Sequence, residues 1–459
     1  FDPNRVDYAT NIDNIDLSLQ SLRLDGRVEY RLNNRSLVYV GGGLQSGTNE
    51  LYGVASLRNQ QIDGEKFSVR AGYESKDFTL RTFYSGNRLT SGAQFFPTSL
   101  SDLGSNVRFD LVSAQPIYRP EFELGGKHAL ILGGEYRFKY IEWDYLNDQQ
   151  QEDHFAVFFQ DIWTLSESLS LNISARLDLH PIIGPLGSPR LAVIYKPTSS
   201  QAIRLSLGTA FRQPTMAETY LDLASNSPIA ASAVALVGLR ELDPERIATV
   251  ELGYRYRSDF LDVEAVGYVN RITNLIVRSP LEATGANARF DPDLGAFVVA
   301  QSLYLNDPRA FIAVGSELSA RFFPVDGVDF GANYTLQYIF DEASGDRFTD
   351  SPVHKVSVWG FLRTAVGLDL GVSGHFVSSQ DWVEPEFDPA DPTGFNTDPL
   401  RVDASVVVIA RAGLRLLDDQ LEVAISGVNL LDFGELRHRE HPFGNQLEAR
   451  VIGSLTARF

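Results

Sequence analysis

The sequence predicts an all-β fold, a transmembrane antiparallel β-barrel, from three observations. Side chains alternate with period two along most of the chain, the alternating segments are long, and the connections between them alternate in length. From Leu169 to His180, for example, apolar residues such as Leu171 occupy one side and polar residues such as Asn172 the other. These segments run for roughly 10 to 16 residues, whereas globular strands usually have roughly 5 or 6. A tilted strand needs about 9 to 11 residues to cross a bilayer.

The alternation also predicts which face of each strand meets lipid, because a membrane barrel turns apolar side chains outward and polar ones toward a wet lumen. The residues expected on the lipid face are Leu169, Leu171, Ile173, Leu205, Leu207, Phe330, Tyr334 and Leu336. In the last strand we expect Val451, Gly453, Leu455 and Ala457 to face lipid, and Phe459 to close the strand.

Short turns and long loops interleave, which is typical of an outer-membrane barrel with periplasmic turns and extracellular loops. Short turns are expected at Asn33–Arg35, Ser75–Asp77, Gly125–Lys127, Ser166–Ser168, Thr198–Gln201, Ser258–Asp259, Asp326–Gly327, Ala365–Val366 and Asp418–Gln420. The longest loops are Gln213–Asp243, Ser279–Asn306 and Asp381–Leu400, and we expect ligand specificity to lie there.

About 19 strands are visible, and all neighbours are expected to be antiparallel. The first, Leu17–Leu32, precedes a short turn and so runs toward the periplasm. It should pair with Ser36–Gly43, and its other edge requires a strand from outside this numbering, because an open edge in lipid is costly. Direct pairing with Leu447–Phe459 would contradict this scheme.

Composition excludes several classes of protein. The 459 residues contain no cysteine, which excludes disulfides and thiolate metal sites, and carry a net charge of −19, which disfavours nucleic acid as a partner. No apolar run approaches the length of a membrane helix. No catalytic constellation stands out, so we do not expect an enzyme.

Several blocks resemble the barrel of the TonB-dependent outer-membrane receptors. They are Ser188-Pro189-Arg190, Tyr195-Lys196-Pro197, Phe211-Arg212-Gln213-Pro214-Thr215 with Glu218, Glu241-Leu242-Asp243-Pro244-Glu245, Tyr268-Val269-Asn270-Arg271, Asn274-Leu275-Ile276, Gly315-Ser316-Glu317-Leu318, Ser351-Pro352-Val353-His354-Lys355, Val428-Asn429-Leu430-Leu431-Asp432 and the terminal Phe459. Their order covers the chain from about Glu152 onward.

The resemblance implies a barrel of 22 strands around an N-terminal plug, preceded by a segment that engages TonB. Residues 1–459 are then a transmembrane barrel domain without its plug and first strands. The resemblance also implies that the barrel-assembly machinery reads the terminal Phe459, and that outer-membrane lipid surrounds the wall.

Candidate ligand-binding residues lie at loop bases and in one histidine cluster. They are Arg212, Tyr220, Tyr304, Trp382, His438 and His441. Arg212 also suits loop anchoring through a carboxylate in the lumen, and tyrosine and tryptophan at a rim also suit an interfacial girdle. His438 and His441 offer imidazole ligands, but the neighbouring Arg437 and Arg439 would repel a metal ion.

The loop Asp381–Leu400 is acidic and contains no lysine or arginine. Its oxygen ligands suit calcium as a cofactor, and the candidate metal residues are Glu384, Glu386, Asp388 and Asp391. The spacing lacks an EF-hand pattern, so a solvated acidic loop is the alternative.

Two functional hypotheses remain open. In the first, the chain is an outer-membrane active-transport receptor that binds a scarce small molecule, such as a ferric siderophore or a cobalamin-like compound, and imports it with energy from TonB. In the second, it is a receptor-like barrel that serves as a structural or partner-binding component of an envelope assembly.

Overall fold

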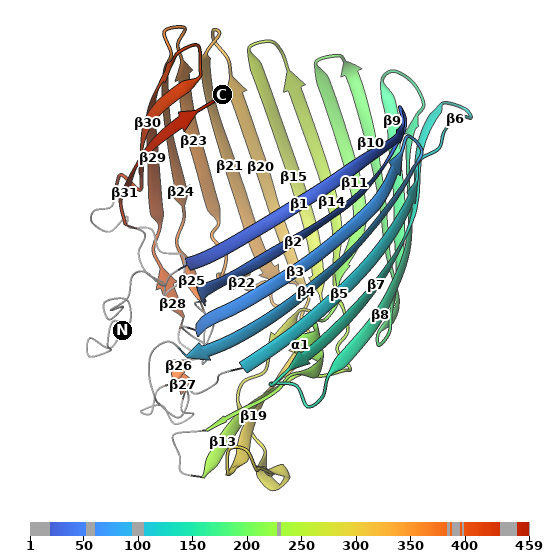
Figure 1. Ribbon diagram of the computed structural model, residues 1–459, viewed down its shortest axis with the longest axis vertical. Helices are drawn as coiled ribbons and strands as arrows, with labels where there is room; N and C mark the ends of the chain where they lie inside the picture. The colour runs from blue at the N-terminus through green and yellow to red at the C-terminus, as the bar shows by residue number, and fades with distance from the viewer. Residues whose placement is uncertain are drawn as a thin grey trace.

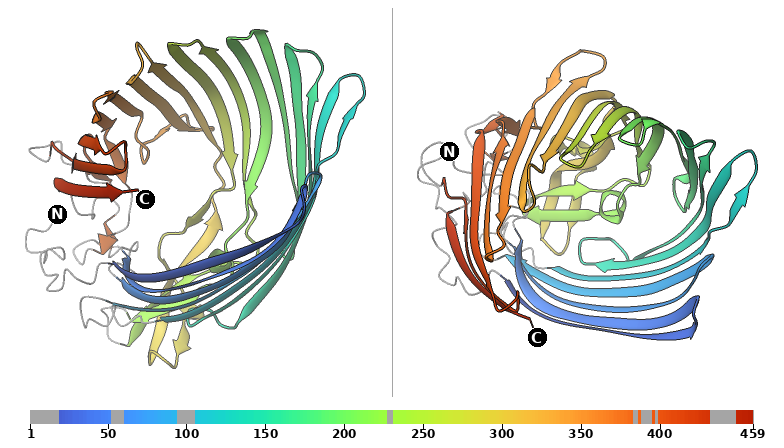
Figure 2. Two further views of the ribbon diagram at one scale, coloured as in Figure 1. Left: turned by 45° about the horizontal axis from the view of Figure 1, so that its top comes forward. Right: turned by 90° about the horizontal axis from the view of Figure 1, so that it is seen from above.

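The computed structural model describes residues 19–51, 60–93, 105–226, 231–382, 386–387, 395–396, 399–431 and 448–458. These residues form a broad sheet of long, tilted strands that curves around a central lumen (Figures 1 and 2). Short turns lie at one rim, at the top of Figure 1, and long connections with their own small sheets lie at the other. Following the expectation from loop lengths, we name these rims periplasmic and extracellular.

The described part of the sheet has 21 strands, of which β6 and β22 are short extensions, leaving 19 strands in the wall. The wall strands are β1 (Leu19–Asn33), β2 (Ser36–Leu51), β3 (Gln60–Ser75), β4 (Phe78–Ala93), β5 (Ser105–Tyr118), β7 (Lys127–Trp143), β8 (Gln150–Thr164), β9 (Leu169–His180), β10 (Gly184–Thr198), β11 (Gln201–Arg212), β14 (Glu245–Arg257), β15 (Leu261–Thr273), β20 (Phe311–Phe322), β21 (Val328–Asp341), β23 (His354–Arg363), β24 (Leu368–Val377), β29 (Ser405–Leu416), β30 (Leu421–Val428) and β31 (Arg450–Ala457). The extensions are β6 (Glu121–Glu123) and β22 (Arg347–Phe348). The predicted strand number is therefore confirmed.

Each wall strand pairs antiparallel with the next wall strand along the chain, as predicted. The predicted pairing at the N-terminal end is also confirmed, since β1 pairs with β2 from Leu19↔Asn49 to Asn33↔Ser36. Among the described residues, β1 has no second partner and does not pair with β31, which pairs with β30.

The residues predicted to face lipid share one apolar face of the wall. Leu205, Leu207 and Phe330 have exposed side chains, at 42%, 42% and 50% of their full areas. The half-buried members of the set share this face, because Leu171 pairs with Val193 and Ile173 with the exposed Leu191. In β31 the pairs Val451↔Gly427 and Leu455↔Val423 place the predicted residues on the same face. Phe459 lies outside the described residues.

The loops at the extracellular rim build sheets of their own. A six-stranded sheet contains β12 (Asp222–Asn226), β13 (Ser232–Val237), β16 (Ile276–Arg278), β17 (Glu282–Ala283), β18 (Arg289–Asp291) and β19 (Ala296–Asn306). Two hairpins pair β25 (Gln380–Trp382) with β28 (Leu400–Val402) and β26 (Glu386–Phe387) with β27 (Phe395–Asn396). The described residues contain the helix α1 (Met216–Tyr220) and the 3₁₀ turn η3 (Gly285–Asn287).

The antiparallel prediction concerns the wall strands and does not extend to these loops, in which β13 and β19 pair in parallel. They belong to two different loops, so neither a hairpin nor the alternation of wall strands fixes their relative direction. The packed apolar clusters of the described residues also lie here, around Val298, Met216 and Leu221. None of the described helices is long and apolar enough to cross a membrane.

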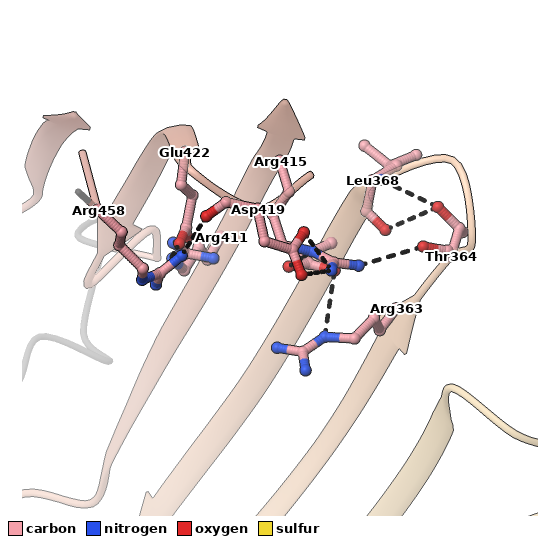
Figure 3. A network of polar contacts seen from close by, with 9 residues as sticks. Arg363, Thr364, Leu368, Arg411, Arg415, Asp419, Glu422 and Arg458 are labelled. Atoms are coloured by element: carbon pink, nitrogen blue, oxygen red, sulfur yellow. Dashed lines mark hydrogen bonds and ion pairs between the residues drawn. The ribbon is translucent and has the colours of Figure 1, made fainter. Parts of the chain in front are cut away.

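Arginine and carboxylate side chains form a polar network at the periplasmic rim near the C-terminus (Figure 3). Arg415 joins two turns, with Nε 2.9 Å from Asp369 Oδ2 and Nη1 2.8 Å from Asp419 Oδ1. Arg458 Nη2 lies 3.4 Å from Glu422 Oε2, and Arg411 also pairs with Glu422. Asp419 has a left-handed backbone (φ 68°), which is uncommon outside glycine. Arg415 thus contacts a tight turn through this residue.

Candidate ligand site at the extracellular mouth

Arg212 fastens the loop between β11 and β14 at its base. Its Nη1 and Nη2 donate to Glu218 at 2.9 and 3.0 Å, and its Nε and Nη2 donate to Glu245 at 2.6 Å each. Glu218 belongs to α1 and Glu245 begins β14, so one guanidinium joins the end of β11 to both. Bidentate pairs of this kind fix orientation as well as distance. These contacts agree with the anchoring interpretation of Arg212.

The same block forms the short helix α1. Thr215 accepts a hydrogen bond from the Glu218 backbone at 3.2 Å, and Glu218 Oε2 accepts one from the Thr215 backbone at 2.7 Å, which is a capping box. Pro214, immediately before, lacks an N–H and suits the end of the strand ladder. The helix therefore has a fixed start, and Glu218 serves both the cap and Arg212.

Tyr220, at the end of α1, ties the loop to the barrel wall. Its hydroxyl donates to Glu152 Oε1 at 3.0 Å, across from β8. Arg240, from the far side of the same loop, lies over the Tyr220 ring at 5.1 Å from its centre. Burial, and then the neighbouring Glu152 carboxylate, raise the pKa of the Tyr220 phenol. Tyr220 is thus engaged within the protein through its hydroxyl and one ring face.

Glu152 is the centre of a buried polar cluster that the sequence analysis missed. His154 Nε2 lies 2.8 Å from Glu152 Oε2, Lys139 Nζ 3.8 Å and His180 Nε2 3.9 Å from it. The Glu152 and His180 side chains are only 3% and 2% exposed. A signal was present, because Glu152 and His154 share one face of β8 and the pair Phe155↔Leu179 brings His180 beside His154.

Glu152, His154 and His180 offer ligand atoms that lie within 4.8 Å of one another, so we tested whether they suit a metal ion. His180 Nδ1 accepts backbone hydrogen bonds from Ile182 and Ile183 at 3.2 and 3.4 Å. In a neutral ring the proton then sits on Nε2, which leaves no lone pair there for a metal. Lys139 adds a nearby positive charge. The geometry favours a hydrogen-bonded centre around Glu152 over a metal site.

Tyr304 packs among the side chains that support the loop sheet. It contacts the buried cluster of Tyr145, Leu221 and Leu223, together with Trp143 and Leu236. Burial raises the pKa of the Tyr304 phenol. Because β19 carries Tyr304 and β12 begins beside Leu221, this cluster joins the two longest described loops into one body over the mouth.

The remaining predicted residues are only partly within the described chain. Trp382 lies in β25, opposite Leu400 of β28. Glu386 lies in β26, opposite Asn396. The other five candidates of the acidic and histidine groups, Glu384, Asp388, Asp391, His438 and His441, lie outside the described residues. Calcium binding and direct ligand contact by the predicted residues therefore stay predictions.

A comparison with protein families decides the identity of the fold. The family described as TonB dependent receptor-like, beta-barrel, matches residues 1–430. The chain belongs to this family. Members are outer-membrane transport receptors rather than enzymes, so the predicted location and the absence of an enzymatic role are confirmed.

Solved TonB-dependent receptors share the fold. The siderophore receptor PirA from Acinetobacter baumannii is 14% identical, with a TM-score of 0.76, over 94% of this chain and 70% of that one. A variant of the ferric enterobactin receptor PfeA from Pseudomonas aeruginosa is 17% identical, with a TM-score of 0.77, over 96% and 69%. The ferric-catecholate import receptor Fiu from E. coli is 14% identical, with a TM-score of 0.65, over 90% and 71%. No curated protein matches the sequence.

Proposed function

We propose that this TonB-dependent receptor captures a ferric siderophore at its extracellular mouth and imports it with energy from TonB. Family membership supports an importing receptor, and the three similar structures are receptors named for siderophores, enterobactin or catecholates. The observation that carries the proposal is the loop body over the mouth, anchored by Arg212 on one side and by Glu152 on the other. A rigid scaffold that holds long loops is the usual arrangement of a binding surface.

The contacts of the anchoring residues indicate where ligand recognition falls. Arg212 and the Tyr220 hydroxyl already hold the loop in place, so we assign contact with the ligand to exposed neighbours on the same loop. Arg240 is the first candidate, since its side chain is exposed and lies over Tyr220. A guanidinium on an aromatic ring suits an anionic, aromatic ligand such as a ferric catecholate.

Uptake of radiolabelled ferric enterobactin tests the proposal. The full gene product is expressed in cells that lack their own catecholate receptors, with and without TonB. We expect TonB-dependent uptake, reduced about tenfold in apparent affinity by Arg240→Ala. Arg271→Ala is the matched control, because Arg271 belongs to the wall strand β15 and pairs with Glu342, and it should leave uptake unchanged.

Two results would contradict the proposal at different levels. Uptake of a cobalamin-like probe in place of ferric enterobactin would overturn the ligand class and keep active transport. Failure to import either probe, together with no retention of the full gene product by TonB, would favour the structural role in an envelope assembly.

A further inference from the structure

The outer face of the wall carries a polar hollow above the apolar band of β2 to β8. In register across β2, β3 and β4, Leu44 pairs with Phe67 and Phe67 with Gly86, on the face where Leu44 and Phe67 are exposed. Two residues further toward the extracellular rim, the same face becomes polar. The next row is Ser46, Glu65, Arg88, Arg108 and Glu142.

This row and the one above it line a hollow of about 900 Å³. The upper row consists of Thr48, Asp63, Thr90, Asn106 and Asp144. Period two keeps both rows on the outer side of the wall. They are therefore separated from the lumen and from the ligand site, and they lie just beyond the lipid-facing residues.

Arg88 and Arg108 stand directly opposite each other at the centre of the hollow. Like charges in this position repel, and the nearly buried Asp110 compensates, accepting from Arg88 Nη1 at 3.1 Å and from Arg108 Nε at 2.8 Å. The Tyr84 hydroxyl also donates to Asp110, at 2.7 Å. The Asp110 carboxylate thus holds both guanidiniums in place.

Arg88 is held through both terminal nitrogens, because its Nη1 also donates to the Asn87 carbonyl oxygen at 2.8 Å and its Nη2 to Asp110 Oδ2 at 3.4 Å, whereas Arg108 is held through Nε. Their side chains remain 44% and 49% exposed. Within the described residues, Arg108 forms its hydrogen bond through Nε alone, and its guanidinium carbon lies over the Tyr140 ring, 5.2 Å from the ring centre. Paired, pre-oriented guanidiniums suit a phosphate group, which accepts parallel hydrogen bonds.

We propose that this hollow binds the phosphorylated sugar headgroup of an outer-leaflet glycolipid. The layers of the wall match such a molecule in order: acyl chains on Phe67 and its neighbours, a phosphate between Arg88 and Arg108, and sugar hydroxyls on the carboxylates and amides around them. Position supports the lipid as the source, because this face borders the membrane rather than the mouth. The proposal depends on the outer-membrane location and not on any imported ligand.

Native mass spectrometry of the full gene product in detergent tests the proposal. The protein is stripped of lipid and given bis-phosphorylated lipid A, its dephosphorylated form, or lipid A together with inorganic phosphate. We expect the phosphorylated form to be retained about tenfold better than the dephosphorylated form, with little competition from inorganic phosphate. Equal retention of the two lipids, or displacement by inorganic phosphate at equal concentration, would overturn the proposal.

The double variant R88Q/R108Q should lose the preference for the phosphorylated form. Arg271→Gln, another arginine of a wall strand, is the matched control and should keep it. Folding is checked by the heat-dependent migration of the barrel on a gel. If the double variant does not fold, the retention of the two lipids by the unaltered protein still tests whether the hollow prefers the phosphorylated headgroup. A folded double variant with unchanged preference would refute the role of the two arginines.

Discussion

The two rims of this barrel use arginine and carboxylate pairs for different tasks. At the extracellular rim, Arg212 reaches from a wall strand into a loop of about 30 residues, and its partners Glu218 and Glu245 are 15% and 18% exposed. At the periplasmic rim, Arg415 is itself 16% exposed and joins two short turns through the shielded Asp369, at 14%, and the solvated Asp419, at 60% (Figure 3). The rims therefore differ less in shielding than in what their ion pairs join. The extracellular network positions a long loop, and the periplasmic network reinforces turns that the strands already close.

Removal of the guanidinium at the extracellular rim should have the largest local effect. Arg212→Ala leaves Glu218 and Glu245 facing one another without a counter-charge. Because Arg212 is partly exposed, we expect a cost of about 2 kcal/mol, below the range for fully buried pairs. Limited proteolysis should show faster cleavage within the loop, and Arg212→Lys should give an intermediate rate. Cleavage at the wild-type rate in Arg212→Ala would show that Arg212 does not anchor the loop.

The bond between Tyr220 and Glu152 should contribute less. Tyr220→Phe removes one hydrogen bond, worth about 1 kcal/mol. The pKa of Tyr220 in the folded protein is raised above the ordinary value of 10.0, so the folded state holds the phenolic proton more tightly. The contribution of the protonated Tyr220 phenol to the stability of the folded loop is complete below about pH 10 and is lost as the pH rises above that value.

The rate of loop proteolysis at alkaline pH distinguishes a hydrogen bond of the Tyr220 hydroxyl from packing of its ring alone. Loop proteolysis in the wild-type protein should accelerate above about pH 10, and Tyr220→Phe should be faster at neutral pH with a weaker alkaline response. An identical alkaline response in both proteins would assign the effect to other groups.

At the periplasmic rim, Arg415→Ala should leave the loop unaffected. Arg415 bonds to Asp369, to Asp419 and to the Thr364 carbonyl oxygen at 3.2 Å, so its loss loosens two turns together. We expect a lower unfolding temperature in detergent, measured by loss of heat-dependent gel migration, with loop proteolysis at the wild-type rate. Faster loop cleavage in this variant would mean that the two rims are coupled.

The smallest effect is expected for Asp419→Asn. The carboxylate is largely solvated, and exposed ion pairs contribute little. The unfolding temperature should stay within error of the wild-type value. A clear decrease would show that the Arg415 pair, rather than the backbone of the turn, holds Leu417–Gln420 in place.

The wall was largely predictable, because lipid and lumen impose opposite demands on alternate residues. The strand Leu169–His180 has the predicted bounds, and the turn at Asn33–Arg35 lies where the chain changes direction. The loop sheet was not predictable to the same extent. The parallel contact of β13 with β19 joins segments some sixty residues apart, and no local pattern specifies it.

In the candidate site, a single contact could be predicted from the sequence, but a cluster of residues from several strands could not. A carboxylate partner for Arg212 follows from the charge of a lumen-facing arginine, and two such partners are present. The cluster around Glu152 needs the register of β8 against β9, which brings His154 beside His180. His438 and His441 were the histidines that the sequence offered as candidates, since they are neighbours in the chain, whereas His154 and His180 become neighbours only after the hairpin forms.

Amide hydrogen exchange in Arg212→Ala and Arg415→Ala, measured on the same samples, tests the central claim most directly. The claim is that each rim has its own arginine network, and that the extracellular one holds the loop body. We expect Arg212→Ala to speed exchange in residues 213–226 and 231–244 by more than about tenfold, with the turn at 417–420 unchanged. Arg415→Ala should do the reverse. Unchanged loop exchange in Arg212→Ala, or faster loop exchange in Arg415→Ala, would contradict the account.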